Sequence, residues 1–264
     1  MWVLYTFLSS FLIAVYYFGN QFAKVGGNQF LIYRGFVPML FFLPFIAQMH
    51  LVTDWRFYVL SILQGSLVCF TDYRNFCALK KWGAETISSI HPFGIFMVFV
   101  IWLIIKPQNL ITYSQNPLQL LLIIAALVGI IYSVSSFKKS KQTWQALVFM
   151  LPYLIIRGLC DVINKLCIGF VATEHLADGN CLYIMLTSFV IGTVNLFLYY
   201  KKGGRTKEII NLKNWPYVLI VIVLIFQMLP RNLAMYSTPN PSFVTALMYM
   251  YVIWIMLAGK ILKH

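Results

Sequence analysis

The feature that most constrains this chain is a succession of long apolar runs that contain almost no charged residues. Of its 264 residues, 61% are hydrophobic and only 10% are charged, whereas soluble domains carry about 25% charged residues. A water-soluble globule of this composition would lack the polar side chains that cover a hydrated surface. We therefore predict an integral, multi-pass membrane protein.

Crossing the hydrocarbon layer takes about 20 mostly apolar residues in a helix, and only helices and closed barrels satisfy their backbone there. The runs are continuous and do not alternate, which favours helices. The connections between them are short, so any function must reside within the bundle. The sequence predicts an all-α membrane protein with nine transmembrane helices, at residues 2–22, 29–47, 57–79, 84–105, 118–136, 144–168, 180–200, 216–236 and 241–262.

The 20 Lys and Arg against 7 Asp and Glu would indicate a nucleic-acid partner in a soluble protein. Here the basic residues lie in short clusters between apolar runs, so we expect a lipid bilayer as partner and no nucleic acid. Most of them follow the odd-numbered spans, which predicts an outer N-terminus and a cytoplasmic C-terminus. These residues are Lys24, Lys80, Lys81, Lys138, Lys139, Lys141, Lys201, Lys202, Arg205, Lys207, Lys213, Lys260 and Lys263.

The five cysteines lie in or beside apolar runs, without CxxC spacing and without a histidine at zinc-finger distance. Because free cysteine packs as a small hydrophobe, we expect no disulfide, metal or cofactor. The first run lacks a basic start and an A-x-A-like cleavage site, so it is interpreted as a span and not as a signal peptide.

Two pairs of segments resemble each other along the chain. Arg74–Leu79 at the end of the third predicted span is similar to Arg231–Tyr236 at the end of the eighth. The region from Asn20 in the first span is similar to the region of Asn164 in the sixth. Both comparisons pair a span with the one five later.

Repeats of five spans must insert with opposite orientation, because five is odd. We therefore predict two inverted repeats, residues 1–140 with five spans and residues 141–264 with four. The chain ends where a tenth helix would be expected, which leaves open a truncated chain or one that works without that helix.

Nearly the whole chain resembles the drug/metabolite transporter superfamily, in its EamA-like branch of ten-helix permeases. The residues that carry the resemblance are Phe18-Gly19-Asn20, Arg34, Ala78-Leu79, 84–92 and 234–259. The resemblance implies a permease in the bacterial inner membrane, with a homodimer as an open option. It also implies cytoplasmic termini, which disagrees with the charge bias at the N-terminus. It places Asn20, Gln64, Tyr73 and Tyr249 around a central cavity.

Ionisable side chains at bilayer depth cost at least about 2.5 to 3.5 kcal/mol, so they are normally paired or face water. Arg157, Asp161 and Lys165 recur every fourth residue in the sixth span, which places them on one helix stripe. They could offer a guanidinium and a carboxylate to a zwitterionic solute, or form a self-neutralising ladder with Lys165 reaching the interface.

Further polar residues interrupt the other spans. His91 precedes Pro92, which allows a bend, so His91 either lines a cavity and exchanges protons or is a buried, hydrogen-bonded side chain. The cavity candidates are Asn20, Gln64, Asp72, Tyr73, His91, Arg157, Asp161, Asn164, Gln227 and Tyr249, and the gate or anchor candidates are Arg74, Asn75, Arg231 and Asn232. Close helix approach is predicted at Gly65, Gly94, Gly129, Gly158 and Gly192.

These observations favour a secondary transporter that moves a small metabolite or drug-like solute by alternating access, with proton coupling left open. No G-x-x-x-x-G-K-[ST] loop is present to bind ATP. The alternatives are an integral membrane enzyme and a non-transporting protein or truncated remnant. The enzyme is disfavoured because H-E-x-x-H and G-x-S-x-G motifs are missing and acids are few, so we predict no catalytic residues.

Overall fold

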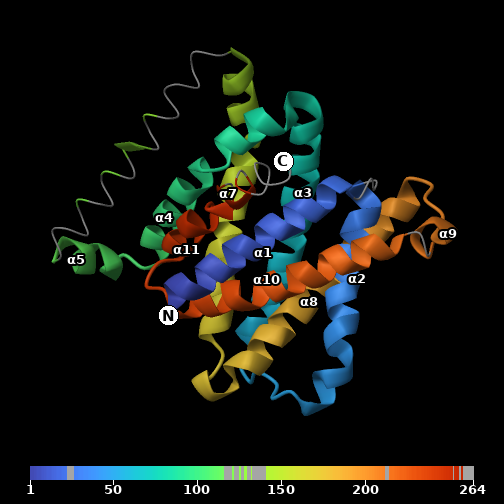
Figure 1. The fold of residues 1–264 in the computed structure, drawn as a ribbon. Helices are drawn as coiled ribbons and strands as arrows, with labels where there is room; N and C mark the ends of the chain where they lie inside the picture. Colours follow the sequence, from blue (N-terminus) through green and yellow to red (C-terminus); the bar gives the residue numbers. More distant parts are fainter. Residues whose placement is uncertain are drawn as a thin grey trace. The chain divides into compact units, whose positions relative to one another are not determined.

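A computed structural model describes residues 1–22, 27–115, 121, 125, 128–129, 132, 141–211, 214–251, 253–255 and 257. Within these residues the chain is helical and has no strand. Its elements, drawn in Figure 1, are α1 (Trp2–Phe22), α2 (Gly27–Phe42), η1 (Leu43–Gln48), α3 (Trp55–Ile90), α4 (Phe93–Ile105), α5 (Gln108–Ser114), α7 (Lys141–Gly169), η2 (Thr173–His175), α8 (Leu176–Lys201), α9 (Thr206–Ile209), α10 (Trp215–Ser237) and α11 (Pro241–Met248).

Four segments of the described chain are long and apolar enough to cross a membrane. They are Gln29–Gln48, Thr143–Gly169, Thr173–Lys201 and Trp215–Ser237. They include the predicted spans 29–47, 144–168, 180–200 and 216–236, so these four predictions are confirmed as apolar helical segments of sufficient length. The architecture is consistent with an all-α membrane protein.

The predicted span 84–105 is wrong as a single helix. Helix α3 ends at Ile90, His91 and Pro92 form a turn, and α4 begins at Phe93. Proline has no N–H to donate and its ring clashes with the carbonyl four residues earlier, so the helix breaks there. A second break lies inside α3 at Gly83, whose φ of 81° is accessible at little cost only to glycine.

The remaining predicted spans have different outcomes. Residues 2–22 form the 21-residue helix α1, which is apolar from Trp2 to Tyr17, and residues 57–79 lie within α3. The predicted span 118–136 falls mostly outside the described residues. The predicted span 241–262 begins with α11, and several of its later residues lie outside the described ones. The total of nine spans therefore stays a prediction.

The chain divides into two compact units. Unit 1 comprises residues 1–69, 163–239 and 247–264, and unit 2 comprises residues 70–162 and 240–246. In unit 1, α1 packs along α10 and α2 packs along α8. Each unit has its own apolar core, around Tyr16, Phe30, Tyr217, Val221 and Leu224 in unit 1 and around Ala78, Ile87, Ile90, Ala146, Leu147, Met150 and Leu154 in unit 2.

Small residues let helices of one unit approach closely. A methyl group added at Gly35 of α2 would lie 2.1 Å from the backbone nitrogen of Gly192 in α8. One added at Gly65 would meet the Val190 side chain at 2.7 Å. Close approach is thus confirmed at Gly65 and Gly192, whereas at Gly129 no described atom lies within 4 Å of an added methyl.

Candidate functional site

Two charged residues of α7 form an ion pair within unit 2. The helical repeat places Arg157 and Asp161 one turn apart, with Nε and Oδ1 separated by 4.0 Å. Asp161 is 2% exposed, whereas the Arg157 side chain is 35% exposed. The distance is at the outer limit of an ion pair, so Arg157 and Asp161 are only loosely paired, and part of the Arg157 side chain is exposed.

Thr245 of α11 holds the Asp161 carboxylate from the other side. Its hydroxyl donates to Oδ2 of Asp161 at 2.8 Å. Helix α11 begins at this place because the Asn240 side chain accepts a hydrogen bond from the backbone nitrogen of Ser242 at 2.9 Å, which is the bonding pattern of a helix N-cap. The Tyr113 hydroxyl in turn accepts from the Asn240 amide at 2.9 Å.

Asp72 belongs to the same group of charges. Its half-buried carboxylate is close enough to Arg157 to interact with it electrostatically, as is that of Asp161. Sequence spacing gave no indication that Asp72 of α3 and Arg157 of α7 would be near each other. In unit 2, the Arg157 guanidinium thus lies within electrostatic range of two carboxylates, and the influence of Asp161 is stronger than that of Asp72.

His91 lies at the end of α3 in unit 2, beside the break at Pro92. A ring nitrogen of His91 lies 3.2 Å from the side-chain oxygen of Asn75, and the imidazole stacks on Tyr153 with ring centroids 5.5 Å apart. This is the arrangement of a half-buried, hydrogen-bonded histidine next to a helix break. Tyr153 was not among the residues singled out from the sequence.

Arg74 is held inside unit 2. It donates from Nε and Nη2 to the backbone carbonyl of Phe149, at 3.0 and 2.7 Å, and its guanidinium carbon lies 4.2 Å from the centre of the Phe149 ring. It therefore fastens α3 to α7. Its neighbour Tyr73 is exposed.

Unit 1 contains a separate network of amides. The Asn164 amide nitrogen of α7 donates to the Tyr183 hydroxyl at 3.0 Å and to the side-chain oxygen of Asn232 at 2.8 Å. The Asn232 amide nitrogen donates to the side-chain oxygen of Asn180 at 2.7 Å. All three asparagines are at most 2% exposed, so α7, α8 and α10 are joined by buried hydrogen bonds.

The network leaves one acceptor unsatisfied. Among the described residues, the buried side-chain oxygen of Asn164 has no hydrogen-bond partner, and the same holds for that of Gln64 in α3.

Lys165, one residue after Asn164, donates to the carbonyl of Met235 at 2.8 Å and to that of Thr238. Lys165 therefore binds the carboxyl end of α10 within unit 1.

The other candidates have varied surroundings. Gln227 is buried, and its amide donates to the Ser9 hydroxyl at 2.7 Å. Tyr249 is half-buried and lies against the Tyr251 ring, and Arg231 is half-buried in α10. Asn20 lies in α1, and its side chain lies outside the described part of the structure.

Unit 2 also has an open groove of about 520 Å³. It is lined by Lys81, Trp82, Trp144, Gln145, Val148 and Phe149. The residues expected to line a cavity are not among them. Arg74 does contact Phe149, so the groove lies beside the polar part of the unit.

Thr245, Asn180 and Tyr183 were missed by sequence reasoning. The signal that could have found Asn180 is an amide at the start of an apolar run, because such a group must find a partner in the membrane. Thr245 and Tyr183 carry no such signal, since hydroxyls are ordinary in membrane helices.

Comparison with known proteins adds no assignment. No protein-family model matches the chain, and no curated protein matches it significantly.

Proposed function

We propose that this protein is a secondary transporter of a small zwitterionic or polar solute, working by alternating access in the bacterial inner membrane. The observation that carries the proposal is the Arg157–Asp161 pair, a loosely paired guanidinium and a nearly buried carboxylate on one apolar helix. Ionisable groups within such helices are rare and mark solute or proton pathways.

The geometry fits a zwitterion better than an apolar solute. Arg157, whose side chain is partly exposed, offers a guanidinium to a solute carboxylate, which a guanidinium binds through two parallel hydrogen bonds. The carboxylates of Asp161 and Asp72, which both interact electrostatically with Arg157, supply the negative charge that would balance a solute ammonium. The proposal includes nine spans in two inverted repeats, residues 1–140 and 141–264, as the EamA-like resemblance implies.

Uptake into proteoliposomes tests this function. The protein is reconstituted and presented with a panel of radiolabelled neutral amino acids, first in counterflow and then with a proton gradient. Arg157→Gln should lower uptake of the accepted solute at least about tenfold in both assays, because it removes a charge-assisted contact worth about 1.5 to 3 kcal/mol. Asp161→Asn should abolish the accumulation that a proton gradient drives.

Arg56→Gln is the matched control, since Arg56 forms an exposed ion pair with Asp54 at 2.6 Å and should leave uptake unchanged. Absence of uptake for the whole panel by the unmodified protein, or equal losses in Arg56→Gln, would contradict the proposal. A membrane enzyme would consume or alter the solute, and a non-transporting protein would leave the vesicles empty.

A further inference from the structure

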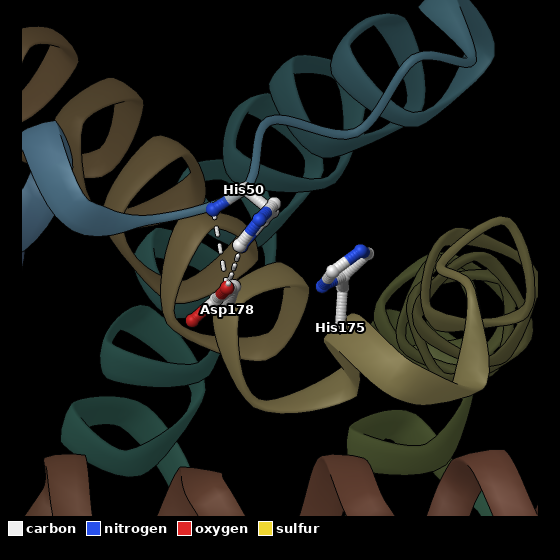
Figure 2. A group of neighbouring side chains, drawn as sticks. All are labelled: His50, His175 and Asp178. Atoms are coloured by element: carbon white, nitrogen blue, oxygen red, sulfur yellow. Dashed lines mark hydrogen bonds and ion pairs between the residues drawn. The ribbon is translucent and has the colours of Figure 1, made fainter.

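A second group of polar side chains lies in unit 1, at the ends of two candidate spans. His50 follows the segment Gln29–Gln48, while His175 and Asp178 lie within the first turns of Thr173–Lys201. Figure 2 shows His50 extending from the segment before α3 toward Asp178, with the His175 ring beside them. The group contains two of the four histidines and one of the seven Asp and Glu residues in the chain.

The three side chains converge on a small volume. A ring nitrogen of His50 lies 3.2 Å from Oδ2 of Asp178, and the two imidazoles stack with centroids 4.0 Å apart. One ligand atom of each residue lies within 4.8 Å of the others. Ligand atoms bound to one tetrahedral zinc ion lie about 3.3 Å apart, since each is about 2.0 to 2.2 Å from the metal.

We infer that His50, His175 and Asp178 form a binding site for a divalent transition-metal ion such as Zn²⁺. The distance between His50 and Asp178 already suits two ligands of one ion. To bring in the third nitrogen, the two stacked rings must rotate apart so that both lone pairs point at the ion, which their partial exposure allows. Two imidazoles and one carboxylate leave a fourth position for water or for Glu174, whose carboxylate lies 3.6 Å from His175.

The chemistry of the donors favours this ion over others. Imidazole nitrogen suits zinc, copper and nickel, whereas calcium and magnesium select oxygen ligands. The side chains of His50, His175 and Asp178 are between 32% and 65% exposed, so an ion can reach them from water. Asp178 is needed because the amino end of α8 otherwise repels a cation.

A bound ion would tie the segment before α3 to the start of α8. These positions are more than a hundred residues apart in the chain, so the ion would cross-link two span ends of unit 1. The inference does not depend on the proposed transport function, because none of the three residues belongs to the Arg157 group.

Titration of the purified protein with Co²⁺ and Zn²⁺ tests the site. For this titration the protein is prepared without a histidine tag, and any bound metal is first removed with a chelator. Binding should give a visible Co²⁺ absorption band that Zn²⁺ abolishes, together with a melting temperature that rises with Zn²⁺ concentration. His175→Ala and Asp178→Asn should each weaken the affinity at least about tenfold, the minimum seen even for outer-shell partners of a metal.

Two matched variants serve as controls. His91→Ala removes a histidine from unit 2, and Asp54→Asn removes a partly exposed carboxylate that contacts Arg56. Both variants should keep the metal affinity. If His175→Ala fails to fold, the isosteric Asp178→Asn still decides the question. The inference is overturned if the unmodified protein gives no Co²⁺ band and no Zn²⁺ stabilisation, or if the affinity survives both ligand substitutions.

Discussion

At the scale of single residues, the buried polar groups of this protein are held by hydrogen bonds between helices. A polar side chain buried without a partner costs about 1 to 3 kcal/mol, and water does not enter the hydrocarbon to relieve it. Asn232 both accepts from Asn164 and donates to Asn180. It is therefore the central member of the unit 1 network.

Asn232→Ala should destabilise the protein by about 1 to 3 kcal/mol, because Asn164 and Asn180 would each lose a buried partner. The measurement is thermal unfolding in detergent, followed by tryptophan fluorescence. Gln115→Ala, at an exposed position after α5, is the control and should leave the melting temperature unchanged. Equal melting temperatures for Asn232→Ala and the unmodified protein would show that the network contributes no stability.

The same residue shows how far sequence reasoning reaches. The presence of Asn164 and Asn232 in apolar runs marked both as candidates, but their distance could not be inferred. The sequence predicts Asn232 as a gate or anchor residue, and the structure adds that it is 1% exposed and hydrogen-bonded to two other asparagines. Contacts between residues far apart in the chain depend on how helices pack, which hydrophobic periodicity does not specify.

At the scale of elements, the start of α3 depends on an aspartate. The Asp54 side chain accepts hydrogen bonds from the backbone nitrogen and the guanidinium of Arg56. The side-chain hydrogen bond from Arg56 is the main reason that the pKa of Asp54 lies below its ordinary value of 3.8. The ionised form is thus favoured in the folded protein.

Asp54→Asn should lower the melting temperature near neutral pH and have progressively less effect in acid. Because the pKa of Asp54 is lowered in the folded protein, ionised Asp54 contributes fully to stability above its ordinary pKa. This contribution is lost as the pH falls through the lowered pKa of the folded state. Melting temperatures of both proteins at about pH 7 and about pH 3 check this. Arg56→Gln should cause a similar loss at neutral pH, and adding it to Asp54→Asn should change little. A pH-independent difference would contradict the assignment.

The contact of α2 with α8 depends on a pair of glycines. An added methyl at Gly35 would lie 2.1 and 2.2 Å from backbone atoms of Gly192, and backbone cannot rotate away as a flexible side chain can. Gly35→Ala should therefore destabilise the protein by about 3 kcal/mol or more, the upper end of overpacking effects. The yield of monodisperse protein in detergent measures this.

Gly169→Ala is the control for the glycine pair, because no described atom lies within 4 Å of a methyl added at Gly169. Normal yield and melting temperature of Gly35→Ala would show that α2 and α8 are not held in close contact.

Helix positions were easier to predict from the sequence than helix breaks. The runs that form α7, α8 and α10 are long, and α7 and α10 continue as single helices through Pro152 and Pro230, so hydropathy alone locates them within a few residues. The run from 84 to 105 is equally apolar, but Pro92 divides it. Hydropathy measures how favourably side chains transfer into the membrane. It does not include the backbone hydrogen bond that is lost at a proline, so the span predicted from hydropathy runs across the break at Pro92.

At the scale of the whole molecule, the proposed transport requires a source of energy. Arg157 shares its charge interactions with Asp161 and Asp72. When a proton neutralises Asp161, Arg157 loses one counterion in an apolar environment, and a solute carboxylate can replace it. Proton uptake and solute binding would then favour each other, which is the requirement for coupled transport.

Asp161→Asn should separate exchange from accumulation, because asparagine imitates the protonated carboxyl but cannot release a proton. Counterflow of the accepted solute should persist, whereas accumulation driven by a proton gradient should disappear. Both are measured in the same proteoliposomes, with the gradient abolished by a protonophore as the reference state. Asp72→Asn, tested in parallel, shows whether the second carboxylate carries the proton instead. Undiminished gradient-driven accumulation in both variants would mean that neither carboxylate couples transport to protons, since the proton must bind and leave the group that couples it.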